Sequence, residues 1–289
     1  MALTPRQVDQ YREQGFLSGI PVFTLAECER FRRTAERFQT EHPTDADWAF
    51  DIKCNLLFDW VYQNATHPRL LEAVADLLGE DLVLTDSVFR IKGPGSSTHY
   101  GWHQDSARIV VEPAPAIVYV AISDATVENG CLAVIPRTHD RVRAFDLVEN
   151  PGQAHRRVAR VRAVDPRDAV HMELRAGEVA VFSANAIHGS APNRSAAARF
   201  AILHDYTPAS ARQSVGRGSG QLVCGRDAFG HFAHEPVPSA DFETNARMRR
   251  RILNEYPENI LMGPLEPGAR PDFPDRPEGP TQLGTVATA

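Results

Sequence analysis

The sequence predicts a mainly β protein with flanking helices, organised around a β-sandwich or barrel. From about residue 81 the chain shows short apolar runs separated by Gly, Pro, Asn and Asp turn signals, including residues 87–92 and 116–122. Further runs over residues 158–164, 178–182 and 199–204 keep the spacing that is typical of all-β folds. Helical patterns precede these strands, so we expect the helices to pack on the outside of the sheet.

Three helices are expected in the first part of the chain, over residues 5–14, 25–39 and 68–78. The first two follow Thr4 and Thr24, each of which has a Gln or Glu three residues later. This spacing is a capping box, in which the hydroxyl and the longer side chain satisfy free amides at the start of a helix. Taken with the strands, the pattern predicts one domain over residues 1–262, with a helical part (1–80), a β-barrel core (81–210), a C-terminal extension (211–262) and a separate Pro/Gly-rich irregular tail (263–289).

Composition narrows the function further. The chain has 289 residues, 43% of them hydrophobic, and a net charge of -6. It is too apolar for a disordered chain, and its acidic balance argues against nucleic acid or an anionic membrane as a partner. The four cysteines form no CxxC pair, and no signal peptide or membrane span is expected. We therefore expect a cytoplasmic protein; the pattern does not predict an oligomeric state.

One short segment carries chemistry: His103 and Asp105 stand two residues apart in the motif Trp-His-Gln-Asp. On a strand or its edge, positions i and i+2 share a face, so both side chains can reach one ion. His188, at the end of a long apolar run, is the best candidate for a third ligand. Two histidines and one carboxylate form the facial triad of non-haem Fe(II) oxygenases, which leaves coordination positions open.

Arg199 adds a second feature. It follows His188 after a turn and begins the next predicted strand. A guanidinium there can bind a carboxylate held near the metal. This arrangement suits 2-oxoglutarate, whose keto acid end would chelate iron while its distal carboxylate reaches Arg199.

Three motifs then resemble the phytanoyl-CoA dioxygenase family of Fe(II)- and 2-oxoglutarate-dependent oxygenases. They are HQD at 103–105, ENGCLAVIPRTH at 128–139 and HGSAPNRSAAAR at 188–199, and the similarity extends over roughly residues 3–210. The resemblance implies a double-stranded β-helix, a cupin-like jelly-roll core. It also implies Fe(II), 2-oxoglutarate and O2 as cofactor and cosubstrates.

By that resemblance His103, Asp105 and His188 ligate iron, and Arg199 holds the distal carboxylate of 2-oxoglutarate. Ser190 falls where relatives place a second contact to this carboxylate, and Lys92 is assigned to the same pocket. The substrate is expected to meet residues around the HQD motif, for which the candidates are His99, Tyr100, Trp102 and Arg108. No catalytic residue is predicted beyond the metal ligands.

The expected outcome is hydroxylation of an unactivated C–H bond in a small molecule, such as a secondary metabolite or an amino acid, with release of succinate and CO2. Some relatives are halogenases, in which chloride replaces the carboxylate ligand, whereas position 105 here is aspartate. The same cofactors also support desaturation, cyclisation or epoxidation, and a non-catalytic metal-binding barrel is a more distant alternative.

An arginine-rich segment around residues 141–170 stays open to two interpretations. Its arginines are Arg156, Arg157, Arg160, Arg162 and Arg167. They fit a solvated loop or edge strand, or a cationic lid over an anionic substrate.

Overall fold

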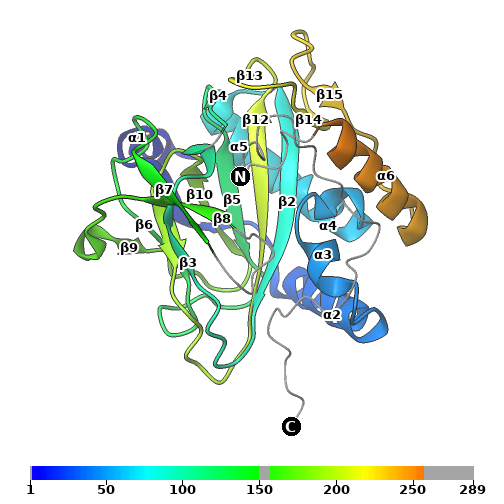
Figure 1. The fold of residues 1–289 in the computed structure, drawn as a ribbon, viewed down its shortest axis with the longest axis horizontal. Coiled ribbons are helices and arrows are strands. Elements are labelled where there is room, and N and C mark those ends of the chain that lie inside the picture. The colour runs from blue at the N-terminus through cyan, green and yellow to red at the C-terminus, as the bar shows by residue number, and fades with distance from the viewer. Residues whose placement is uncertain (1, 108, 150–156, 257–289) are drawn as a thin grey trace.

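The structure is a computed structural model that describes residues 2–107, 109–149 and 157–256. Two sheets face each other in it (Figure 1). The large sheet has seven strands, in the spatial order β1 (Phe16–Pro21), β10 (Glu178–Ser183), β5 (Ala116–Ala121), β12 (Arg199–Pro208), β2 (Leu82–Lys92), β14 (Ser219–Cys224) and β15 (Ala233–His234). The small sheet has the order β3 (Tyr100–His103), β11 (His188–Ser190), β6 (Leu132–Val134) and β9 (Val170–His171).

Two short strand pairs complete the β structure. They are β4 (Val111–Glu112) with β13 (Arg212–Gln213), and β7 (Phe145–Glu149) with β8 (Arg157–Val161). Side chains from β5, β10 and β12 of the large sheet share one apolar cluster with side chains from β6 of the small sheet. The interior between the sheets is therefore a packed layer, and the sheets stay open at their edges rather than closing into a barrel.

Helices cover the other face of the large sheet (Figure 1). They are α1 (Pro5–Gln14), α2 (Leu25–Glu41), α3 (Ala46–Phe50), α4 (Asp59–Ala65), α5 (Pro68–Leu78) and α6 (Phe242–Glu255). The 3-10 turns of the described residues are η1 (Cys54–Leu56), η2 (Asp105–Ala107) and η3 (Pro166–Asp168). Both predicted capping boxes are present, at Thr4 and Thr24. No helix in the described residues is long and apolar enough to span a membrane.

Several elements differ from the sequence prediction. The part expected to be helical, residues 1–80, also contributes strand β1, which forms an edge of the large sheet. Its sequence FLSGIP has no strict alternation, and a register irregularity interrupts its pairing with β10. Helices α3, α4 and α6 were also not expected. The tail expected at 263–289 lies outside the described residues.

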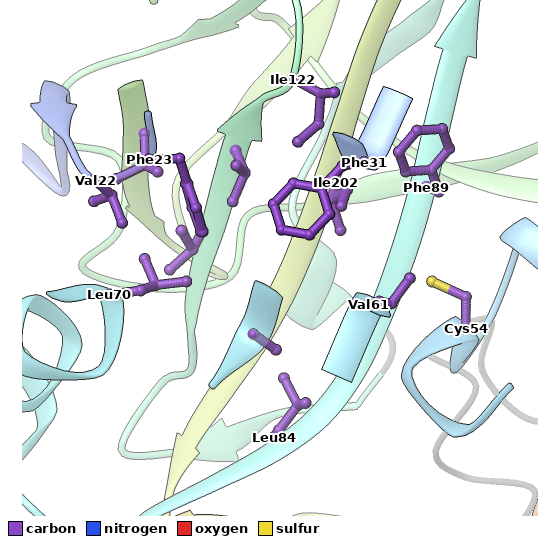
Figure 2. Packing of buried hydrophobic residues seen from close by; sticks show 14 of the residues in the cluster. Val22, Phe23, Phe31, Cys54, Val61, Leu70, Leu84, Phe89, Ile122 and Ile202 are labelled. Carbon is purple, nitrogen blue, oxygen red and sulfur yellow. The ribbon is translucent and has the colours of Figure 1, made fainter. Parts of the chain in front are cut away.

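The main apolar core lies between the helices and the large sheet. Figure 2 shows Leu84 and Phe89 of β2 and Ile202 of β12 among helix residues such as Val61 and Leu70. All of these side chains are at most 2% exposed. The large sheet is thus anchored on its outer face by packing, which leaves its inner face available for polar groups.

Alternation along β12 divides these two faces. His204 bonds to Asn64 of α4 at 2.8 Å, and the hydroxyl of Tyr206 donates to the carbonyl of Ala65 at 2.6 Å. Even-numbered residues of β12 therefore point at the helices. Because successive strand residues alternate, the odd-numbered residues point at the small sheet. Those residues are Arg199, Ala201, Leu203 and Asp205.

Phe38 lies at the centre of an aromatic cluster in the core. Its ring centroid is 4.8 Å from that of Phe58 and 5.1 Å from that of Phe242, which joins α2 to α6. We expect Phe38→Ala to lower the free energy of unfolding by about 3–5 kcal/mol, because it removes a buried ring and leaves a cavity. Denaturant unfolding measures this. Phe229→Ala, at a ring that is 51% exposed, should change the value by no more than about 0.5 kcal/mol, and equal losses in both variants would contradict the packing described.

His204 should make stability depend on pH. It is fully buried and neutral, since Ser87 and Asn64 bond to its two ring nitrogens, and burial lowers its pKa to about 3. The folded pKa lies below the unfolded one, so the stability linked to His204 is complete above about pH 6.5 and is lost as the pH falls toward 3. The expected slope is up to about 1.4 kcal/mol per pH unit.

This slope can be measured by denaturant unfolding between pH 4 and 7. His204→Gln should reduce it by up to about 1.4 kcal/mol per pH unit, the contribution of one proton. His171→Gln, at an exposed histidine, serves as the control and should leave the slope unchanged. An unaltered slope in His204→Gln would refute the assignment.

Candidate metal centre

Three side chains meet at the edge where β3 and β11 pair. His103 ends β3, Asp105 begins η2, and His188 begins β11 directly opposite His103 in the antiparallel ladder. Nε2 of His103 is 3.4 Å from Oδ1 of Asp105, and Nε2 of His188 is 3.6 Å from Oδ2 of the same carboxylate. One ligand atom from each residue lies within 4.8 Å of the others. The sequence-predicted triad is thus brought together.

Backbone carbonyls orient both imidazoles. Nδ1 of His103 bonds to the Gly101 carbonyl at 2.7 Å, and Nδ1 of His188 bonds to the Ala186 carbonyl at 3.0 Å. A carbonyl can only accept, so each Nδ1 carries the proton and each Nε2 keeps a free lone pair. Metal-binding histidines commonly donate their other ring N–H in this way, which fixes the orientation of the ring.

The electrostatics of the cluster fit a divalent cation. Burial, together with the neighbouring His103, lowers the pKa of His188 to about 4, so its imidazole is neutral. Burial acts to raise the pKa of Asp105, but His188 and His103 outweigh it and the pKa is lowered. Burial acts to lower the pKa of His103, but the neighbouring Asp105 carboxylate outweighs it and the pKa is raised. One ionised carboxylate and two imidazoles form the ligand set of the 2-His-1-carboxylate iron sites.

Gln104, between the two ligands, fastens this segment to the rest of the molecule. Its amide donates to the carbonyls of Asn185 and of Arg141, the latter at 2.9 Å, and its oxygen accepts from the amide of Arg143 at 2.7 Å. The side chain is 1% exposed. Sequence reasoning gave Gln104 no role. Because its side chain is fixed by these backbone contacts and it lies between the two ligands in the sequence, Gln104 is well placed to fix their spacing.

A pair of buried cations lies on the inner face of the large sheet. Arg199 of β12 stands opposite Lys92 of β2, and both are at most 2% exposed. Nζ of Lys92 donates to the hydroxyl of Ser190 at 2.7 Å, and Arg199 donates to the carbonyl of Gly130 at 2.5 Å. Burial and the nearby Arg199 lower the pKa of Lys92 to about 7. Two adjacent buried cations need an anion, which a dicarboxylate supplies.

Two further atoms support an anion at this position. Nε of Arg199 and the hydroxyl of Tyr119 are both buried without a hydrogen-bond partner among the described residues. The guanidinium carbon of Arg199 lies 5.7 Å from the centre of the Tyr119 ring. Buried polar atoms are normally paired, so these two donors are available to bind a ligand. Tyr119 was missed from the sequence because its strand, β5, appeared only as an apolar run.

The predicted substrate-facing residues separate in the structure. The Tyr100 ring centre lies 5.8 Å from Nζ of Lys92 and 5.9 Å from the guanidinium carbon of Arg90, so it is close to the buried pair of Lys92 and Arg199. Trp102 packs against the apolar cluster of Ile135, Val161 and Ile187. His99 is exposed, with Nδ1 3.2 Å from the carbonyl of Ser97. Arg108 lies outside the described residues, and a substrate role for these four residues stays a prediction.

The arginine-rich segment forms the β7–β8 hairpin. Arg162 pairs with Asp146 at 2.5 Å and Arg167 with Asp165 at 2.6 Å, all on the surface. A Cβ added to Gly101 would meet Nε of Arg160 at 3.2 Å, so β8 lies against β3. These pairings favour the edge-strand interpretation. Arg156 lies outside the described residues, and the side chain of Arg157 is not described.

The sequence profile of the family described as Phytanoyl-CoA dioxygenase (PhyH) matches residues 11–201, about two thirds of the chain. The chain belongs to the phytanoyl-CoA dioxygenase family. Phytanoyl-CoA dioxygenase domain-containing protein 1 of Mus musculus is 24% identical over 251 residues, which cover 67% of this chain and 86% of the relative.

Solved structures share the fold. The non-heme monooxygenase ThoJ is 25% identical, with a TM-score of 0.78, and the match covers 88% of this chain and 97% of ThoJ. CytC3, solved with Fe(II) and alpha-ketoglutarate, is 19% identical with a TM-score of 0.60 over 80% of this chain and 93% of CytC3. The predicted jelly-roll class is confirmed, and this phytanoyl-CoA dioxygenase family member is an Fe(II)- and 2-oxoglutarate-dependent oxygenase.

Metal affinity should depend on Asp105. We expect Asp105→Ala to weaken Fe(II) binding at least about 100-fold, because the variant loses the only anionic ligand of the triad and leaves two imidazoles. Anaerobic calorimetric titration with Fe(II) measures the dissociation constant. Asp168→Ala, at an exposed aspartate, is the matched control. Similar affinities in the Asp105 variant and the wild type would place the metal elsewhere.

Proposed function

We propose that this enzyme hydroxylates an unactivated C–H bond of a small-molecule substrate and releases succinate and CO2. The observation that carries the proposal is the aspartate at position 105, which stands beside both histidines. A carboxylate there occupies the position that chloride would need in a halogenase. The likeness to ThoJ, described as a monooxygenase, points to insertion of an oxygen atom.

Each residue of the site has a role in this proposal. His103, Asp105 and His188 hold the iron on one side of the interior, and Lys92, Ser190 and Arg199 bind the distal carboxylate of 2-oxoglutarate. The bound iron and cosubstrate supply the oxidising chemistry, with 2-oxoglutarate losing CO2 to give succinate.

The protein contributes position and charge. Arg199 and Lys92 would hold one end of the cosubstrate, which would leave its keto acid end for the triad. The bonds from Nδ1 of both histidines to backbone carbonyls keep the imidazoles aimed at the metal.

Other reaction types would differ from hydroxylation in what happens to the substrate rather than in the residues that hold the metal and the cosubstrate. Desaturation, cyclisation and epoxidation use the same residues. A non-catalytic metal-binding barrel is disfavoured, because it would have no use for two buried cations beside the metal cluster. The cytoplasm, expected from the sequence, is the proposed compartment.

The product distinguishes these outcomes. Candidate amino acids, nucleotides, terpenoids, acyl-CoAs and phosphonates can be screened for substrate-stimulated succinate formation with Fe(II), 2-oxoglutarate and O2. Mass spectrometry should then show a product that is heavier by one oxygen atom. A product that has lost two hydrogen atoms would replace hydroxylation by desaturation or cyclisation.

Arg199→Gln tests the cosubstrate site. We expect the dissociation constant of 2-oxoglutarate to rise about 100-fold, because a buried charge-assisted pair of hydrogen bonds is lost. Anaerobic titration of the visible charge-transfer band of the Fe(II)–2-oxoglutarate complex reports binding without turnover. Arg162→Gln removes a surface arginine and should have no effect. An unchanged constant in Arg199→Gln would overturn the assigned role.

A further inference from the structure

Two metal ligands are each preceded by a residue that contacts the same loop, residues 135–143. Gln104 precedes Asp105, and its side chain bonds to the main chain of this loop. Ile187 precedes His188, and its main chain bonds to the same loop. The 135–143 loop lies between β6 and β7, and its contacts are separate from the β3–β11 ladder. It therefore forms a second connection between the two sides of the metal site.

Asp105 is the ligand whose position most needs such support. Each imidazole of the triad is held by a bond from Nδ1 to a backbone carbonyl. Among the described residues, only these two imidazoles lie within ion-pair distance of the Asp105 carboxylate, and no other donor reaches it. The main chain on either side of Asp105 therefore sets where its carboxylate lies. On the far side, the amide of Ser106 donates to the carbonyl of Ala184 at 3.3 Å.

On the near side, the Gln104 side chain has every kind of hydrogen-bonding group engaged. Its nitrogen donates to the carbonyl of Arg141 at 2.9 Å and to that of Asn185, and its oxygen accepts from the amide of Arg143 at 2.7 Å. All three partners are main-chain groups, so these bonds fix the path of the backbone. Among side chains of this length, only glutamine offers both donors and an acceptor. Because the residue is 1% exposed, water cannot readily replace them.

Thr138 makes the corresponding connection on the side of His188. Its hydroxyl donates to the carbonyl of Ile135 at 2.7 Å and accepts from the amide of Ile187 at 2.9 Å. The carbonyl of Ile187 in turn accepts from the amide of Ile135 at 2.8 Å. Both main-chain polar groups of the residue before His188 are thus held by the 135–143 loop.

The 135–143 loop is itself anchored, so it can act as a fixed support. The amide of Arg137 donates to the carbonyl of Gln14, at the end of α1, at 2.9 Å. Ile135 packs in one apolar cluster with Ile187, and Trp102 of β3 packs against this cluster. Trp102 directly precedes the remaining ligand, His103, so the residue before every ligand is tied to this part of the molecule.

We propose that Gln104 and Thr138 are positioning residues, which hold Asp105 and His188 in the arrangement that binds the metal by tying the residue before each ligand to the 135–143 loop. The inference rests on the proposed oxygenase function, since it concerns the metal site of that reaction. It adds two residues to the site, neither of which is a ligand.

Gln104→Met keeps the length of the side chain and removes its amide. In the full-length protein we expect the dissociation constant of Fe(II) to rise about 10- to 100-fold, which is the usual effect of losing a group that orients a metal ligand. Anaerobic calorimetric titration measures this constant. The visible charge-transfer band of the Fe(II)–2-oxoglutarate complex should also change in energy or intensity, because the band depends on the arrangement of the ligands.

Gln221→Met is the matched control for a general loss of stability. Gln221 is also 1% exposed, accepts from the side chain of Asn55 at 2.7 Å and donates to the carbonyl of Pro236 at 2.8 Å. It lies on β14, which carries no metal ligand. The control should lower the Tm as Gln104→Met does, but leave Fe(II) affinity and the band unchanged. Equal weakening of Fe(II) binding in both variants, or none in Gln104→Met, would overturn the role of Gln104.

Thr138 is tested by a pair of variants, which also serves if Gln104→Met folds poorly. Thr138→Val keeps the shape of the side chain but removes the hydroxyl, so Fe(II) binding should weaken about ten-fold. Thr138→Ser retains the hydroxyl and should bind Fe(II) within about two-fold of the wild type. Equal affinities in the two variants would show that the hydroxyl positions nothing, and would overturn the role of Thr138.

The wild type separates this inference from the proposed function. If Fe(II) and 2-oxoglutarate produce no charge-transfer band in the wild type, the proposed function fails and the positioning roles fail with it. If the wild type gives a normal band, unchanged Fe(II) affinity in both Gln104→Met and Thr138→Val removes only the positioning roles.

Discussion

The functional site depends on the register of one short antiparallel ladder. Pairing of β11 with β3 places His188 opposite His103, and an irregularity before Ser190 brings Tyr100 opposite that serine. Gly189 is needed for this approach, because a Cβ there would lie 2.8 Å from the carbonyl of Tyr100. A slip of one residue would turn His188 to the other face of the sheet. The metal cluster and the contact of Ser190 with Lys92 both follow from this pairing.

The large sheet separates stability from chemistry by alternation along its strands. On β12, side chains such as Ile202 and Tyr206 are buried against the helices, and the polar ones among them find partners there. Residues on the opposite face, Arg199 and Asp205, carry charge into the space between the sheets. Because packing on the outer face stabilises the sheet, the inner face can hold charged groups that contribute little to stability but can bind ligands. The buried ion pair of Lys53 with Glu235 ties the residue before η1 to the residue after β15 of the large sheet.

The features that the sequence could predict were those that depend on residues close together in the chain or on a recognisable motif. The capping boxes at Thr4 and Thr24 identified two helices, since the required side chains lie three residues apart. The spacing of His103 and Asp105, with the turn after His188, identified the metal cluster. Strand β1 was missed because its apolar residues do not alternate and its burial comes from pairing with β10, some 160 residues away. The opposed pair Asp86 and Asp205 was likewise invisible, since its meaning arises only from the register between two distant strands.

On the inner face of the large sheet, the pairing of β12 with β2 places like charges opposite each other at two positions. At one end, Lys92 and Arg199 face each other and lower the pKa of the lysine, at a cost that a dianion can offset. At the other end, where Asp86 and Asp205 face each other, burial raises the pKa of both carboxyls, and Asp86 raises that of Asp205 further. Local rules that fail in a folded protein tend to fail at functional positions.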